Sequence, residues 1–250
     1  MPFRPRGPKP ETPSNEWSVI RGCVTVIAVL LLATPALAAG RPVTIVASDG
    51  TTLAGMFYEA SPRPAPAVVL VHMLGRSKDE WRIVAERLAD AGIASLAIDL
   101  RGHGRSGGDG SALPAMVVDV RAALGWLATH PSVRPDWLGV VGASLGGTLA
   151  AIAAADVPTV RAIAMISPSL DYRGLRLDAS IMRKLGTRPV WMAASTEDPY
   201  ALRTVKELTQ DGGAREQRLS GVRGHGTALL WADPDLARAL VDWLRRTLIF

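Results

Sequence analysis

The sequence predicts an α/β fold, in which a mostly parallel central sheet carries helices on both faces and an antiparallel hairpin at its N-terminal edge. Three observations lead to this prediction. Apolar runs without polar alternation recur along the chain, as in strands buried on both faces of a parallel sheet. Amphipathic helical patterns separate these runs, so strand and helix alternate. The 250 residues, 48% of them hydrophobic, suffice for one domain of this kind.

The first 39 residues are predicted to lie outside that domain. Arg21 precedes a segment, residues 22–40, that contains no charged residue and ends in small side chains. This order is typical of a signal peptide, and it predicts an exported protein, periplasmic or secreted, with cleavage near Ala38 or Ala39. The alternative is an uncleaved anchor, which would supply the only membrane contact. Residues 40–250 are predicted to form a single domain.

The elements of this domain follow in order. Strands at residues 42–48 and 52–60 flank Asp49-Gly50, a dipeptide typical of a hairpin turn. Buried strands are predicted at residues 67–72, 94–100, 137–143, 160–167 and 189–195, and a last strand at 216–221. Helices are predicted at residues 113–127, where the apolar side chains share one face, and at 233–248. The alternation supports the parallel sheet.

Composition excludes several classes of function. The only cysteine, Cys23, lies in the leader, so residues 40–250 have no thiol for a disulfide, a metal site or catalysis. The net charge is +5, and the basic residues are scattered without interleaved aromatics, which argues against a nucleic-acid partner. Neither a metal nor an organic cofactor is expected, because no ligand cluster or phosphate-binding fingerprint occurs. The oligomeric state is not indicated.

Ser144 stands between two glycines in the stretch Gly142-Ala-Ser-Leu-Gly146. A predicted strand precedes it and a run of small helix-forming residues follows, which is the setting of a sharp turn that lifts a serine hydroxyl above the sheet edge. The two glycines avoid a Cβ that would crowd the turn. The helix N-terminus that follows favours a developing anion. The alternative is a serine that only caps this helix.

A nucleophilic serine requires a base and a carboxylate that orients the base. Of the four histidines, His225 lies in a glycine-flanked loop between the last strand and the C-terminal helix. From there it can reach the carboxyl edge of the sheet, where sites form in open α/β sheets. Asp198 directly follows a buried strand and is the expected carboxylate. Glu197 and Asp171 remain alternatives.

Five separate stretches resemble the α/β-hydrolase superfamily in the same order, over about residues 43–244. They are VLVHMLGRSKDEW, AIDLRGHGRSGG, VVGASLGGTLA, ASTEDPYA and RGHGTALL. The chain is most similar to the compact dienelactone-hydrolase-like and small serine esterase members. The resemblance implies Ser144 as nucleophile, His225 as general base and then acid, and Asp198 as the orienting carboxylate. It also implies an oxyanion hole formed by the backbone amides of Leu145 and Leu74.

Two departures from the family pattern bear on these assignments. The family often has His-Gly in the oxyanion loop, whereas this chain has His72-Met73, so a side chain stands where close backbone approach is usual. Dienelactone hydrolases proper use a cysteine, and the serine of this chain favours ester hydrolysis in general. His72, Asp99 and His103 are expected to hold loops at the sheet edge by hydrogen bonds.

The predicted function is a serine hydrolase that cleaves carboxylic esters of small to medium acyl chains through an acyl-enzyme intermediate. Only 21 residues, 168–188, separate two strands at the place where larger relatives insert a lid, so an open site without a large lid is expected. The candidate substrate-binding residues are Met73, Leu170, Tyr172 and Tyr200. The alternatives are a serine peptidase, thioesterase or amidase on the same fold and, from another class, a non-catalytic binding protein.

Overall fold

The computed structural model describes residues 1–3, 7, 9, 39–211 and 213–250. The chain separates into one unit at Met1–Thr34 and another at Pro35–Phe250, and only the second is treated below. Residues 10–38 of the predicted signal segment lie outside the described residues. Within the described ranges, no helix has both the length and the apolar character needed to cross a membrane.

An eight-stranded sheet forms the centre of the domain, in the order β1-β2-β4-β3-β5-β6-β9-β10. Its strands are β1 (Arg41–Val46), β2 (Thr52–Tyr58), β3 (Ala65–Val71), β4 (Ala94–Ile98), β5 (Val133–Ala143), β6 (Val160–Ile166), β9 (Val190–Ser195) and β10 (Arg215–Ser220). The pairs β1–β2 and β2–β4 are antiparallel, and every other pair is parallel. The predicted α/β fold, with an N-terminal antiparallel hairpin, is confirmed.

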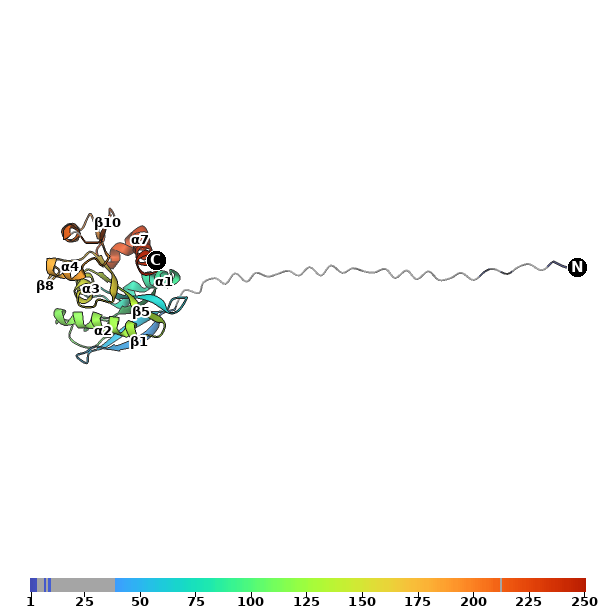
Figure 1. Ribbon diagram of the computed structural model, residues 1–250, viewed down its shortest axis with the longest axis horizontal. Coiled ribbons are helices and arrows are strands. Elements are labelled where there is room, and N and C mark those ends of the chain that lie inside the picture. The colour runs from blue at the N-terminus through green and yellow to red at the C-terminus, as the bar shows by residue number, and fades with distance from the viewer. Residues whose placement is uncertain (4–6, 8, 10–38, 212) are drawn as a thin grey trace. The chain divides into compact units, whose positions relative to one another are not determined.

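Helices cover both faces of this sheet (Figure 1). On one face lie α2 (Met116–Thr129), α3 (Leu145–Ala155), α4 (Ala179–Leu185) and α5 (Pro199–Leu208), and on the other lie α1 (Arg82–Asp90), α6 (Thr227–Ala232) and α7 (Pro234–Leu248). Three short 3-10 helices, η1 (Lys78–Trp81), η2 (Leu113–Ala115) and η3 (Thr209–Asp211), complete the helical elements of the described chain.

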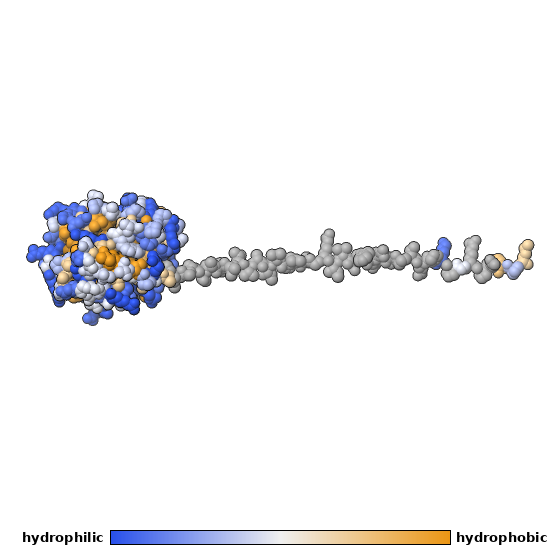
Figure 2. Space-filling model, turned by 90° about the horizontal axis from the view of Figure 1, so that it is seen from below, coloured by the Kyte–Doolittle hydropathy of each residue, from blue (hydrophilic) through white to orange (hydrophobic). Residues whose placement is uncertain are grey.

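The buried side chains form two apolar clusters, one on each face of the sheet. Along β3, Val69 and Val71 belong to one cluster and Val68 and Leu70 to the other, because successive side chains of a strand point to opposite faces. This explains why the strand is apolar at every position. The surface in Figure 2 is mostly hydrophilic, with separate hydrophobic patches.

Helix α3 is the most deeply embedded helix of the domain. Nine of its eleven residues are buried, and it packs against β5, β6, α2 and α4. Its sequence is accordingly apolar or small on all sides, as expected for a helix with no solvent face. The helix that follows Ser144 is therefore anchored in the core.

The segment between β6 and β9 is short, in agreement with the expected absence of a large lid. It contains the two-stranded hairpin of β7 (Asp171–Tyr172) and β8 (Leu175–Arg176), followed by α4. Leu175, Leu177 and Met182 are buried against the cluster that contains α3. The hairpin thus lies over the carboxyl edge of the sheet without a separate core of its own.

Candidate active site

Ser144 alone connects β5 to α3. Its φ of 51° and ψ of −118° lie in a region that residues with a side chain seldom adopt, so the turn is strained. Two backbone hydrogen bonds hold it there: the Ser144 amide donates to the Ile166 carbonyl at 2.8 Å, and the Ser144 carbonyl accepts from the Gly147 amide at 2.9 Å. Strand β6 and helix α3 together fix the position of the hydroxyl.

The two glycines around Ser144 are required by close backbone approach. A Cβ at Gly142 would overlap the carbonyl oxygen of Gly146, and a Cβ at Gly146 would overlap the carbonyl oxygen of Val71. Both obstacles are backbone atoms, which cannot move as a flexible side chain would. The pattern of glycines in this stretch therefore has a direct steric cause.

The structure brings Ser144, His225 and Asp198 together. The Nε2 atom of His225 lies 2.8 Å from the Ser144 Oγ, and the Nδ1 atom lies 2.5 Å from the Asp198 Oδ2. The three residues follow β5, β10 and β9, whose carboxyl ends meet at one edge of the sheet. With Asp198 ionised, Nδ1–H donates to the carboxylate, which leaves Nε2 as the acceptor for the serine hydroxyl.

The other carboxylate oxygen of Asp198 is also engaged. Oδ1 accepts a hydrogen bond from the Ala201 amide at 3.1 Å, so Asp198 is the N-cap of α5, with Pro199 as the first helical residue. The helix N-terminus stabilises the negative charge and fixes the orientation of the carboxylate. One residue thus begins a helix and orients the histidine.

Neither alternative carboxylate contacts His225. Asp171 lies on β7, where it accepts a hydrogen bond from the Gly174 amide at 2.7 Å and pairs with Arg176 at 3.4 Å. Glu197 is exposed, and its backbone amide donates to the Ser195 hydroxyl at 3.0 Å. Of the three candidates, the geometry selects Asp198.

A hollow of about 290 Å³ opens beside Ser144. Ser144 itself is 8% exposed, whereas the His225 side chain is 49% exposed, so the histidine is accessible to water and to small molecules. Residues 167–169 and 171–173, together with Tyr200, form the remaining wall. The site is open to solvent and partly polar.

The predicted wall residues are distributed over different places. Tyr172 and Tyr200 line the hollow, and Leu170 lines an adjoining cavity. Met73 is not among the lining residues of the hollow; its sulfur atom lies beside Gly226, and its side chain packs against the cluster that contains α7. The hollow is thus walled by the segment after β6 and by α5.

The loop after β3 is held by two buried side chains. Nδ1 of His72 donates to the Met73 carbonyl at 2.7 Å, and Nε2 accepts from the Leu100 amide at 3.0 Å. Burial lowers the pKa of His72 to about 4, in agreement with a neutral ring that donates through one nitrogen and accepts through the other. On the opposite side, the Met73 amide donates to Glu80 Oε1 at 3.2 Å.

These bonds leave the next amide of the loop available. The Leu74 amide makes no hydrogen bond to any described residue, whereas the Met73 amide is occupied by Glu80. Leu145 stands at the first position of α3, where its amide has no carbonyl partner within the helix. The amides of both predicted donors, Leu74 and Leu145, are therefore unoccupied by other described residues.

Glu80 was not anticipated from the sequence. It is only 9% exposed, its Oε2 atom has no hydrogen-bond partner among the described residues, and burial raises its pKa. In the sequence, Glu80 lies among other charged residues in SKDEW, residues 77–81, a pattern typical of the surface. The one signal in the sequence is the adjacent Trp81. In the structure Trp81 is fully buried, and the short helix η1 directs the Glu80 side chain into the protein beside it.

The loop after β4 has its own buried ion pairs. Asp99 accepts hydrogen bonds from the Lys78 amide, the Lys78 ammonium group and the Arg105 amide at 2.8, 2.8 and 2.9 Å. Arg101 is bound by Asp119, with 2.6 Å between Nη2 and Oδ1. Nδ1 of His103 donates to the Arg101 carbonyl at 2.9 Å. The loops at the sheet edge are thus held by hydrogen bonds, as expected.

Comparison with known proteins identifies the family. The family described as "Serine aminopeptidase, S33" matches residues 62–211, more than half of the chain. The chain is an α/β hydrolase and belongs to this family. A pimeloyl-[acyl-carrier protein] methyl ester esterase of Xanthomonas oryzae pv. oryzae is 32% identical over 200 residues, which cover 73% of the hydrolase and 74% of the esterase.

Two further relatives place the hydrolase more broadly. A polyketide transferase of Stachybotrys chlorohalonatus is 29% identical over 164 residues, which cover 60% of the hydrolase but only 55% of the transferase. A dienelactone hydrolase of Anabaena variabilis superimposes with a TM-score of 0.69 at 21% identity and covers 85% of the hydrolase and all of its own chain. The structural likeness establishes the fold.

Proposed function

We propose that this protein is a serine esterase that cleaves carboxylic esters through an acyl-enzyme intermediate. The observation that carries the proposal is the hydrogen-bonded chain from Ser144 through His225 to Asp198, which opens onto a solvent-accessible hollow. An ester substrate is supported by the relatedness to the methyl ester esterase. The unoccupied amides of Leu145 and Leu74 supply the second requirement, which is stabilisation of a negative oxygen.

The reaction follows from these roles. His225 removes the proton of Ser144 as its oxygen attacks the ester carbonyl, and the negative charge on the tetrahedral oxygen is bound by the two amides. His225 then donates the proton to the leaving alcohol. In the second half, a water molecule that loses a proton to His225 attacks the acyl-serine, and His225 returns that proton to the Ser144 oxygen as the acid is released. Asp198 keeps Nδ1 protonated throughout.

The test is hydrolysis of p-nitrophenyl esters by the wild-type protein and by Ser144→Ala. We expect kcat to fall by about a thousandfold or more in the variant, in line with the removal of a triad serine. A fluorophosphonate probe should label the wild type at Ser144 and leave the variant unlabelled. Wild-type protein that neither hydrolyses esters nor takes up the probe would refute the proposal and favour the non-catalytic binding protein.

A peptidase is the second candidate, because the matching family carries that description. An aminopeptidase needs an anionic group near the nucleophile to bind the free amino terminus. Asp171 is the one carboxylate among the residues that line the hollow, but it already binds the Gly174 amide and Arg176. Aminoacyl p-nitroanilides, assayed beside the esters, discriminate the two. Faster hydrolysis of the anilides would select the peptidase.

We also propose that the protein is exported, periplasmic or secreted. The proposal is supported by the charge-free apolar segment at residues 22–40 and its small-residue end. Cell fractionation, with mass spectrometry of the purified protein's N-terminus, tests it. A mature N-terminus near residue 39 or 40 is expected. An intact leader in the membrane fraction would indicate the anchor instead.

A further inference from the structure

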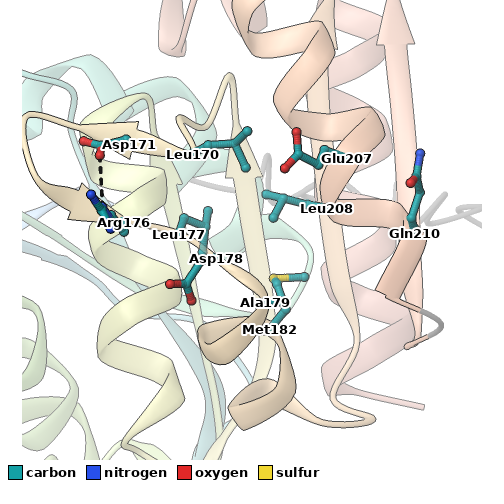
Figure 3. Close-up of a pocket in the computed structure, with 10 residues that line it drawn as sticks. All are labelled: Leu170, Asp171, Arg176, Leu177, Asp178, Ala179, Met182, Glu207, Leu208 and Gln210. Carbon is teal, nitrogen blue, oxygen red and sulfur yellow. Dashed lines mark hydrogen bonds and ion pairs between the residues drawn. The ribbon is translucent and has the colours of Figure 1, made fainter.

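A second cavity adjoins the candidate active site. Its volume is about 450 Å³, larger than that of the hollow beside Ser144, and Asp171 lines both. It lies between α4 and the C-terminal half of α5, behind the β7–β8 hairpin (Figure 3). The segment after β6 therefore lines both the hollow beside Ser144 and this cavity.

The inner lining of the cavity is apolar. Leu170, Leu177 and Leu208 come from three different segments, and Figure 3 shows them directed toward the same space, with Met182 and Ala179 of α4 below them. Such a surface binds an alkyl chain by excluding water from both, at roughly 25 cal/mol per Å² of apolar area. Two of the ten lining residues, Arg176 and Gln210, carry side-chain hydrogen-bond donors.

The rim carries charge of mainly one sign. Asp171, Asp178 and Glu207, which form this rim, line the cavity beside the apolar residues, and Arg176 is the cation among the lining residues. Arg176 is already paired with Asp171 at 3.4 Å. A chain that ends in a carboxylate would meet net repulsion here, whereas an uncharged chain would not.

Tyr200 lines the hollow beside Ser144 and contacts Asp171, the residue that lines both spaces. Its hydroxyl accepts a hydrogen bond from the Ser169 hydroxyl at 3.1 Å and donates to the Asp171 carbonyl at 3.3 Å, and so joins α5 to β7 and to the residues just before it. Tyr200 is 55% exposed, so little packing holds it in place. Breaking two hydrogen bonds of a solvent-exposed side chain costs little free energy, so Tyr200 can move aside for a long acyl chain.

The space beside Ser144 leads toward this cavity. Nε2 of His225, which donates the proton to the leaving alcohol, faces Ser144 and the hollow of about 290 Å³. A different hollow of about 370 Å³ is lined by Asp198, the partner of Nδ1, and not by Ser144. An acyl chain that extends from Ser144 through the space walled by Tyr172 and Tyr200 meets Asp171, which also lines the larger cavity.

We infer that the cavity between α4 and α5 binds the distal part of a long, uncharged acyl chain whose ester carbonyl reacts at Ser144. The inference rests on the proposed esterase function, and it extends the substrate class from short or medium esters to long-chain ones. It makes Leu170, Leu177 and Leu208 determinants of chain-length specificity.

The test fills the cavity after the protein has folded. In the full chain with Cys23→Ser, which removes the only native thiol, Ala179→Cys places a thiol in the cavity lining. Arg183→Cys, one turn later on α4 and also exposed, is the matched control, because residue 183 does not line the cavity. Both proteins are assayed before and after labelling with a bulky maleimide.

We expect labelling of A179C to lower the ratio of kcat/KM for a dodecanoyl ester to that for an acetyl ester by about tenfold or more. Loss of burial of two methylene groups is already enough for such a change. Labelling of R183C should leave the ratio unchanged. An unchanged ratio in labelled A179C, with acetyl ester hydrolysis intact, would overturn the inference alone. No hydrolysis of any ester before labelling would overturn the proposed function.

A second measurement addresses the charge of the rim. At low salt, the dodecanoyl ester should be hydrolysed faster than the monoester of a dicarboxylic acid of equal length, and added salt should narrow the difference. Equal rates at every salt concentration would contradict the assignment of this acidic rim to the chain-binding site.

Discussion

The backbone amide of Met73 donates a hydrogen bond to the buried carboxylate of Glu80. Met73 occupies the position where relatives often have glycine, and this bond removes its amide from the candidate oxyanion hole. We therefore expect Glu80 to have a positioning role, in which it fixes the loop that carries the next amide, that of Leu74.

Replacement of Glu80 tests this role. We expect Glu80→Ala to lower kcat by about ten- to a hundredfold with little change in KM, because a displaced donor weakens transition-state binding more than ground-state binding. Glu80→Gln retains an acceptor oxygen and should recover most of the rate. Asp79→Asn, at the exposed neighbouring position, is the control. A similar fall in both kcat and thermal stability, without rescue by Gln, would indicate a structural role only.

Asp198→Asn should lower kcat by up to about 10⁴-fold, because an amide at this position no longer selects the Nδ1-protonated tautomer of His225. Glu197→Gln, one residue earlier, should have almost no effect, since the side chain is exposed and does not contact the histidine. Steady-state kinetics of both variants distinguish the two carboxylates. A greater loss in the Glu197 variant would reverse the assignment.

His72 should make the protein less stable as the pH falls. Its pKa is about 4 in the folded protein, against 6.5 for the free side chain, so the unfolded chain binds a proton first. The stabilising contribution is complete above pH 6.5 and is lost as the pH falls toward 4, by up to about 1.4 kcal/mol per pH unit. An NMR titration of the ring checks this directly. A midpoint near 6.5 would contradict it.

Gly146→Ala should prevent formation of the turn at Ser144 and yield inactive or unfolded protein, because the added methyl group overlaps the Val71 carbonyl. Gly125→Ala is the contrasting change, since nothing lies within 4 Å of that position in α2. It should stabilise the domain by roughly 0.5–1 kcal/mol through helix propensity. Urea denaturation and ester hydrolysis, measured together, compare the two.

Asp119→Ala should cost about 3 kcal/mol or more of the free energy of unfolding. The Asp119 side chain is fully buried and binds Arg101, which is 7% exposed, so its removal leaves a buried guanidinium group without this partner. Arg121→Ala breaks the exposed pair with Asp156 and should cost less than about 1 kcal/mol. Equal costs, measured by urea denaturation, would mean that Asp49, which also pairs with Arg101 at 2.8 Å, is sufficient to compensate the guanidinium group.

Much of the fold was predictable because its signals are local. The apolar runs predict the central strands, since strands buried on both faces leave no polar position. Strand β5, however, begins at Val133 rather than at the predicted residue 137. Its first residues include Arg134, Pro135 and Asp136, which are typical of a loop. They belong to the strand only because Val133 pairs with Ala65, and the register shifts between this pair and the next.

The site was predictable to a lesser extent. The turn at Ser144 carries its signal in adjacent glycines, and the order of strands places His225 and Asp198 at the same edge. Glu80 and the cavity between α4 and α5 could not be found in this way. Glu80 binds the amide of Met73, seven positions earlier, because the single turn of η1 directs its side chain toward that loop. The cavity exists only because three separate segments leave space between them.

Because α3 is buried, catalytic turnover requires that the whole domain is folded. The nucleophile stands at the first turn of a helix that is surrounded by strands and helices on all sides, so it cannot be displaced while the rest of the domain stays folded. Residual activity after heating should therefore follow global unfolding rather than local fraying. Hydrolysis of a chromogenic ester would then serve as a simple screen for stabilised variants of this protein.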